Sequence, residues 1–188
     1  MIGFDNHNAL QLALPDSPER QAAQAVLDQV HQEEALAHRL MSDMRRADQA
    51  FEGLVELPGY AIFEPHSLDD NNLFDRCGEY VFGRILGEPW CVPRQAYPAS
   101  QYLYNDTRDF LRSKGFTLVD PAKVVPGDIV AYTGEHPIYG HEATLQFGFV
   151  LGESRVRSRF GPGPVFEHNL ASIPSRWGSS VFFWRKLL

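Results

Sequence analysis

One cysteine lies at a position that would favour a reactive thiolate. Cys77 lies near the start of the helix predicted over residues 73–86, whose apolar residues recur near helical spacing. Backbone N–H groups at a helix N-terminus stabilise a thiolate, and the positive charge of Arg76 would add to that effect. The residue type and its place make Cys77 the leading candidate for nucleophilic chemistry. A buried packing role is the alternative for a free cysteine.

A catalytic thiol needs a base, and histidine is the side chain that exchanges a proton most readily near neutral pH. His141 precedes the strand predicted over residues 144–151. In a regular strand, residues 141 and 146 point to opposite faces and lie roughly 16 Å apart. A bulge or loop near Gly140 would therefore be needed to bring His141 onto the thiol.

His168 is the second candidate base. The strands predicted over residues 155–160 and 165–168 are joined by a turn rich in glycine and proline. If Gln146 pairs with Ser158, the turn over residues 161–164 places His168 near Val156, on the same face as Ser158 and roughly 7 Å from it. Each histidine can equally be a surface or packing residue, so both assignments stay open.

Gln146 and Trp90 complete the set of candidate site residues. The amide of Gln146 cannot take up and return a proton at neutral pH, but it can hold a substrate carbonyl or an orienting hydrogen bond. Trp90 follows the predicted cysteine helix, in a loop that leads to several tyrosines. These rings could bind a peptide or a sugar, and core packing is the alternative.

The elements that must position these residues begin with an N-terminal helix. Ser17, Pro18 and Glu19 form a helix start, and no Gly or Pro follows before Gly53. The pattern predicts a helix of about 34 residues, roughly 50 Å long, with an apolar stripe at seven-residue spacing. The stripe packs on the helix's own domain or on a partner protein. We therefore expect an N-terminal helical extension over residues 1–52 and a second unit over residues 53–188.

In the second unit, the sequence pattern predicts helices followed by strands. A loop-like segment precedes the cysteine helix, and a second helix is predicted over residues 102–114. This order favours an α+β fold with an antiparallel strand meander. The predicted strands cover residues 116–119, 128–132, 144–151, 155–160, 165–168 and 181–185.

Residues 73–186 resemble the papain-like superfamily of NlpC-type cell-wall peptidases and CHAP amidases. The matching elements are the cysteine-headed helix, PGDIVAY (126–132), and QFGFVLG (146–152) followed by RVRSRFG (155–161). The resemblance implies a papain-like α+β fold, with Cys77 as the nucleophile of an enzyme that hydrolyses amide bonds, commonly in peptidoglycan. It also places Ser158 at the family's third polar position. Two residues depart from the pattern: Arg76 replaces an Asp or Asn, and Gln146 replaces the catalytic histidine.

Two functions follow from this resemblance. The first is a thiol amide hydrolase acting on a peptide or peptidoglycan-like substrate. In it His141 or His168 is a displaced base, and Gln146, Ser158 and Trp90 are polar or binding residues. The second is a catalytically inactive papain-like fold, a binding or structural assembly module whose protein partner contacts the N-terminal helix. A third alternative is an unrelated α+β domain that matches by chance.

The composition of the chain argues against some classes of binding partner. The net charge is -7 and there is no block of Lys and Arg, which argues against nucleic acid or an anionic membrane. No metal site or cofactor is predicted, because the histidines and acids lack ligand spacing and no phosphate-cradling glycine loop is present. No signal peptide and no apolar run of roughly 20 residues is visible. These features leave a cytoplasmic location or delivery within a larger assembly.

Overall fold

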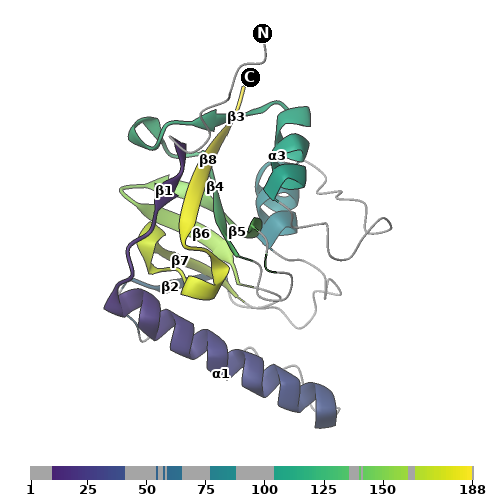
Figure 1. Ribbon diagram of the computed structural model, residues 1–188, viewed down its shortest axis with the longest axis vertical. Coiled ribbons are helices and arrows are strands. Elements are labelled where there is room, and N and C mark those ends of the chain that lie inside the picture. Colours follow the sequence, from purple (N-terminus) through teal and green to yellow (C-terminus); the bar gives the residue numbers. More distant parts are fainter. Residues whose placement is uncertain are drawn as a thin grey trace.

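A single antiparallel sheet dominates the computed structural model, which describes residues 10–40, 54, 57, 59–64, 77–87, 104–135, 140, 142–160 and 164–187. The sheet has eight strands in the order β1-β8-β4-β5-β6-β7-β2, and β3 also pairs with β8 (Figure 1). The strands are β1 (Leu12–Ala13), β2 (Ala61–Glu64), β3 (Phe116–Val119), β4 (Ile129–Glu135), β5 (Glu142–Gly152), β6 (Arg155–Arg159), β7 (Val165–Asn169) and β8 (Ser180–Lys186).

The described helices are few, and most of them are short. Two are α-helices, η3 is a π-helix, and the other three are single 3₁₀ turns. They are α1 (Pro18–Leu40), η3 (Glu79–Ile85), α3 (Tyr104–Ser113), η5 (Pro121–Lys123), η6 (Leu170–Ser172) and η7 (Ser175–Trp177). None of the helices within the described ranges is long and apolar enough to cross a membrane.

This architecture corrects the predicted fold class. The sequence predicts a papain-like α+β domain behind a helix of about 34 residues, whereas the protein is mostly antiparallel sheet with short helices. The N-terminal helix α1 covers 23 residues, and residues 41–53 lie outside the described residues. The prediction was wrong because helical periodicity reports local preference only, while packing between distant segments sets helix length and layering.

The two faces of the sheet bury different side chains. On β4, Ala131 belongs to a core cluster with Phe147 and Trp184, whereas its neighbour Tyr132 belongs to a second cluster with Val156. Successive residues of a strand point to opposite faces, so the clusters mark the two sides. We call them the η3 face, covered by η3 and α3, and the α1 face, where α1, η6 and η7 pack (Figure 1).

The first half of α1 is fixed to the body of the protein. Arg20 is buried, and its guanidinium donates to the carbonyl oxygens of Leu14 (3.3 Å), Pro15 (3.1 Å), Ile173 (3.2 Å) and Gly178. These bonds satisfy a buried cation with four carbonyl dipoles in place of an acid. They tie the helix to the loops on either side of η7.

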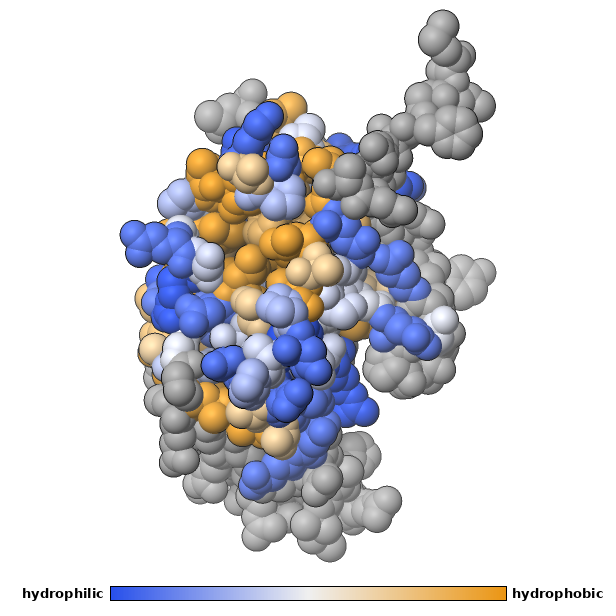
Figure 2. All heavy atoms as spheres, turned by 60° about the vertical axis from the view of Figure 1, so that its left-hand side comes forward, coloured by the Kyte–Doolittle hydropathy of each residue, from blue (hydrophilic) through white to orange (hydrophobic). Residues whose placement is uncertain are grey.

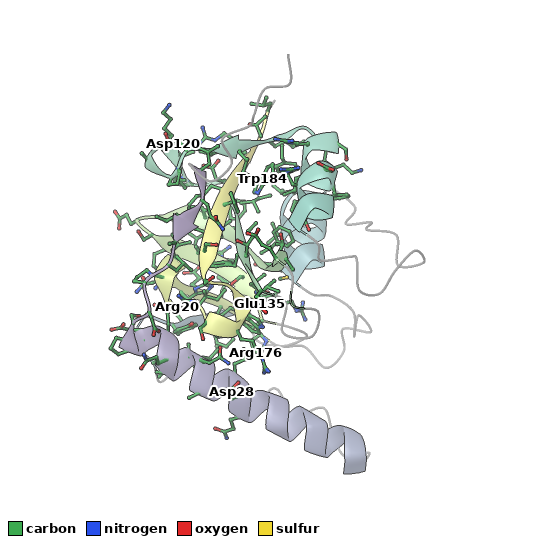
Figure 3. The ribbon with its side chains drawn as sticks, in the orientation of Figure 1. Arg20, Asp28, Asp120, Glu135, Arg176 and Trp184 are labelled. Atoms are coloured by element: carbon green, nitrogen blue, oxygen red, sulfur yellow. The ribbon has the colours of Figure 1, made fainter. Side chains whose placement is uncertain are left out.

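Polar contacts continue this attachment along the same side of α1. Gln24 Oε1 accepts from the backbone N–H of Arg176 (2.7 Å). Asp28 lies 3.6 Å from the Arg176 guanidinium, and Figure 3 shows both side chains between α1 and the body. Residues 20, 24 and 28 are spaced by four, which places them on one face of a helix.

The Pro126-Gly127-Asp128 motif is a structural corner. The Asp128 carboxylate is buried and accepts from the N–H of Val125 (2.9 Å) and from two nitrogens of Arg185 (2.7 Å each). Gly127 has φ +99°, a conformation that favours glycine. The motif therefore joins the start of β4 to β8, and this role accounts for its residues without chemistry.

Candidate functional site

Cys77 lies on the η3 face. It is the first residue of the described segment 77–87, is half-buried, and packs against the cluster that contains Phe147 and Trp184. Downstream, the N–H of Leu86 donates to the carbonyl of Val81, the i→i+5 bond of a π-helix. Part of the thiol's surroundings is therefore apolar, and the residues before Cys77 lie outside the described ranges.

Gln146 points to the other side of the sheet. It pairs with Tyr132 of the α1 face, and its neighbour Phe147 points to the η3 face with the Cys77 cluster. The Gln146 side chain is only 3% exposed, and Nε2 donates to the carbonyl oxygen of Arg159 (2.6 Å). The amide is therefore bound to the backbone of the neighbouring strand and does not face the thiol.

The same amide extends the pairing of β5 with β6. Their backbone register is Phe149 with Arg157 and Val150 with Val156. Farther toward the start of β5, the Gln146 side chain provides the contact to β6 instead. Glutamine at this position therefore has a structural use that its sequence pattern does not reveal.

Ser158 and His168 come together as a closed pair. The register places His168 opposite Val156, as predicted, although β5 pairs with β6 in a register that does not place Gln146 opposite Ser158. Ser158 Oγ lies 2.7 Å from His168 Nε2, and His168 Nδ1 lies 2.9 Å from the carbonyl oxygen of Asn169. A carbonyl only accepts, so Nδ1 carries the proton and Nε2 accepts from the serine hydroxyl.

This geometry resembles a nucleophile and its base, but it is sealed from solvent. Both side chains are 0% exposed. Burial lowers the pKa of His168 to about 4, and the backbone bond to Asn169 opposes that shift only in part. The imidazole is therefore neutral at pH 7 and no substrate reaches the hydroxyl in this arrangement.

Two tyrosines complete this buried polar group. Tyr60 stacks on His168 at 5.5 Å between ring centroids, and its hydroxyl donates to the carbonyl of Ser172 (2.6 Å). The Tyr132 hydroxyl donates to the carbonyl of Leu170 (3.3 Å). Burial raises the pKa of both phenols above the ordinary range. Each polar group is thus paired internally, as stable burial requires.

The remaining predicted site residues cannot be placed. His141 and Trp90 lie outside the described residues. Within the described ranges, no group of three or more His, Cys, Asp or Glu side chains is arranged to hold a metal ion. Ser158 and His168 are therefore the predicted site residues that the structure brings together, and Cys77 and Gln146 lie on opposite faces.

Sequence reasoning missed a surface cluster on β6 and β7. Arg157 binds Glu167 through Nε (3.1 Å) and Nη2 (2.6 Å), and its guanidinium carbon lies 3.3 Å from the centre of the Phe63 ring. The alternating arginines of RVRSR were the available signal, because a period of two places them on one strand face. Phe63 gave no signal, since β2 falls in a segment predicted as loop.

Comparisons with protein-family models, curated proteins and solved structures find no match.

Proposed function

We propose that this chain is a non-catalytic protein-binding module. The observation that carries the proposal is the position of Gln146, which is buried on the α1 face and bonded to the Arg159 carbonyl. Cys77 packs on the opposite face. His168, the described candidate base, is sealed on the same side as Gln146. The polar groups that a hydrolase would present to substrate are used here to hold strands together.

An exposed apolar area supports a binding role. On the side that carries β1 and the corner after η5, apolar side chains gather on the surface (Figure 2). Leu12 is 39% exposed and Val125 is 46% exposed, and half-buried Val124 packs against the buried cluster of the α1 face. Contiguous apolar surface rimmed by polar residues commonly marks a contact with another protein.

Only part of the surface of the N-terminal helix is available to a partner protein. Arg20, Gln24 and Asp28 bond to the body, so the side of α1 that carries them is already occupied along its first half. A partner that uses this helix would have to contact its remaining surface.

The Gln146→His substitution tests the non-catalytic assignment. It restores the imidazole of the resembled family. The background is Cys91→Ser, which leaves Cys77 as the single cysteine of the two in the sequence, and Cys77 alkylation by iodoacetamide is measured from pH 5 to 9. We expect no change in the pH profile, because residue 146 faces away from the thiol. A thiol pKa well below the usual value of about 8.5, together with peptidoglycan hydrolysis that Cys77→Ser abolishes, would overturn the proposal.

Site-specific crosslinking tests the binding role directly. A photoreactive amino acid replaces Val125 in the full chain, and Thr117, which is exposed on β3, serves as the matched control. We expect one recurrent crosslinked protein from position 125, lost when Leu12→Asp is added, and none from position 117. Equal crosslinking from both positions would mean that the apolar area is not a specific contact.

A thiol amide hydrolase is the second candidate. Cys77 is half-buried rather than sealed, and it lies two residues before the π-helix η3, a backbone feature that often marks functional sites. In this proposal His141 is the base and Trp90 contacts a peptide or peptidoglycan-like substrate. Fast alkylation of Cys77 that slows in His141→Ala, with parallel loss of hydrolysis, is the expected result.

A further inference from the structure

Three arginines alternate along β6 and therefore share one face of the sheet. Arg155, Arg157 and Arg159 point to the same side, and Glu167 of β7 lies opposite Arg157. On this face of β6 and β7, Glu167 is the one acidic residue. Arg159 is only 2% exposed, so Arg155 and Arg157 are the arginines of this face that a ligand could reach.

Two of these guanidinium groups reach across β7 to the end of the sheet. Arg155 Nη1 donates to the carbonyl oxygen of Gly59 (2.7 Å), just before β2. The guanidinium of Arg157 lies over the ring of Phe63 in β2. Since adjacent strands are about 4.8 Å apart, these contacts link β6 to the segment that carries β2, two strands away.

Both arginines are held in place but retain donors. Arg157 uses Nε and Nη2 on Glu167, and Arg155 Nη2 lies 3.9 Å from the other carboxylate oxygen. A guanidinium has five N–H donors, so each has N–H groups beyond these contacts. The side chains of Arg155 and Arg157 are 32% and 23% exposed, which leaves them accessible to a ligand. Fixed groups lose little conformational entropy when they bind.

The neighbouring strand offers an edge for backbone pairing. Among the described strands, β2 pairs with β7 alone, so its other side carries no described partner. Phe63 is 48% exposed there, with Arg157 stacked on its ring. An extended segment can add to such an edge through main-chain hydrogen bonds, with its side chains selected by neighbouring groups.

We propose that an extended acidic segment of a partner protein adds to the outer edge of β2. Its carboxylates contact Arg155 and Arg157, and the guanidinium of Arg157 is held over the Phe63 ring. Carboxylates fit because guanidinium groups bind them with paired, charge-assisted hydrogen bonds. This inference rests on the proposed binding function and names the chemistry of one partner segment.

Fluorescence anisotropy with three synthetic probes tests this. The first is an acetylated, labelled peptide of alternating Val and Glu, six residues long. The second replaces Glu with Lys. The third carries an N-methyl group on every residue, which removes its backbone N–H donors and so prevents strand pairing. We expect binding of the first probe only, weakened at high salt. Equal binding of the N-methylated probe would overturn edge addition, and equal binding of the Lys probe would overturn the role of the arginines.

Variants locate the contact. Arg155→Gln and Phe63→Ala should each weaken binding of the acidic probe roughly tenfold. Arg176→Gln, which removes an exposed arginine on the other side of the sheet, should leave binding unchanged. A variant counts only if its thermal unfolding matches the parent. No binding of the acidic probe, with a partner still crosslinked at position 125, would remove this assignment and leave the binding function standing. Cys77-dependent hydrolysis, with the acidic probe still bound, would remove the non-catalytic assignment and leave this contact standing.

Discussion

At the scale of single residues, the buried polar side chains discussed above form hydrogen bonds to other groups of the protein. Gln146 donates to a backbone carbonyl, and Ser158 donates to His168. Arg20 donates to four carbonyls. A buried group left without a partner costs about 1–3 kcal/mol, so each pairing is required for the fold whether or not it serves a function.

The stability of the protein should depend on pH through His168. Its pKa is about 4 in the folded protein and about 6.5 in an unfolded chain. Between these values the unfolded chain binds a proton that the folded protein does not, so stability falls as pH decreases from about 6.5 to 4. The total loss is about 3 kcal/mol. Urea unfolding measured from pH 7.5 to 4.5 should show it, and His168→Gln should flatten the slope. An unchanged slope in that variant would assign the effect to other groups.

At the scale of elements, close approach between β5 and β6 depends on a glycine. A Cβ added at Gly148 would lie 2.3 Å from Cγ1 of Val156 and 3.1 Å from Cγ1 of Val130. Both valines are buried in the same cluster, so neither moves freely. These strands can therefore pair this closely only if residue 148 has no side chain, which explains the glycine in this strand.

Gly148→Ala should destabilise the protein by about 1–3 kcal/mol, because the added methyl overpacks the core. Adding Val156→Ala should recover part of the loss by removing the nearest contact. Gly83→Ala in η3 is the control, since a Cβ there meets nothing within 4 Å, and it should be neutral or slightly stabilising. Chemical denaturation measures all three. A neutral Gly148→Ala would show that β5 and β6 do not approach this closely.

At the scale of the whole molecule, α1 is attached to the sheet by a buried cation. Arg20 joins the helix to the segments on either side of η7, and Ala23 and Leu27 add apolar contact with Phe160 and Phe166. The N-terminal helix is thus part of the body along its first half. This favours a binding module in which a partner protein contacts the sheet as well as the helix.

Arg20→Ala should detach the first half of α1 and destabilise the protein by about 3 kcal/mol, because four carbonyls lose their donor. Hydrogen exchange should show faster exchange over residues 18–28 than over β4 and β8. Gln21→Ala is the control, since its side chain makes a single exposed contact to Asp16. Uniform loss of protection across the sheet would indicate instead that α1 and the sheet unfold as one unit.

Local pattern was sufficient for much of the strand content. The segments predicted over residues 116–119, 144–151 and 181–185 are found in β3, β5 and β8, and the capping role of Ser17 at the start of α1 is confirmed. The edge strands β1 and β2 were missed because they are short and lie among prolines and polar residues, where alternation is not visible.

The sequence by itself determined which residues could form strands, where α1 begins, and that His168 would lie opposite Val156. These depend on neighbours in the chain and on the period of two along a strand. Only the tertiary structure decided that the sheet dominates the fold, that Gln146 and Cys77 occupy opposite faces, and that Ser158 and His168 are sealed from solvent. Burial and facing depend on what packs above each strand, and those contacts join segments far apart in the sequence.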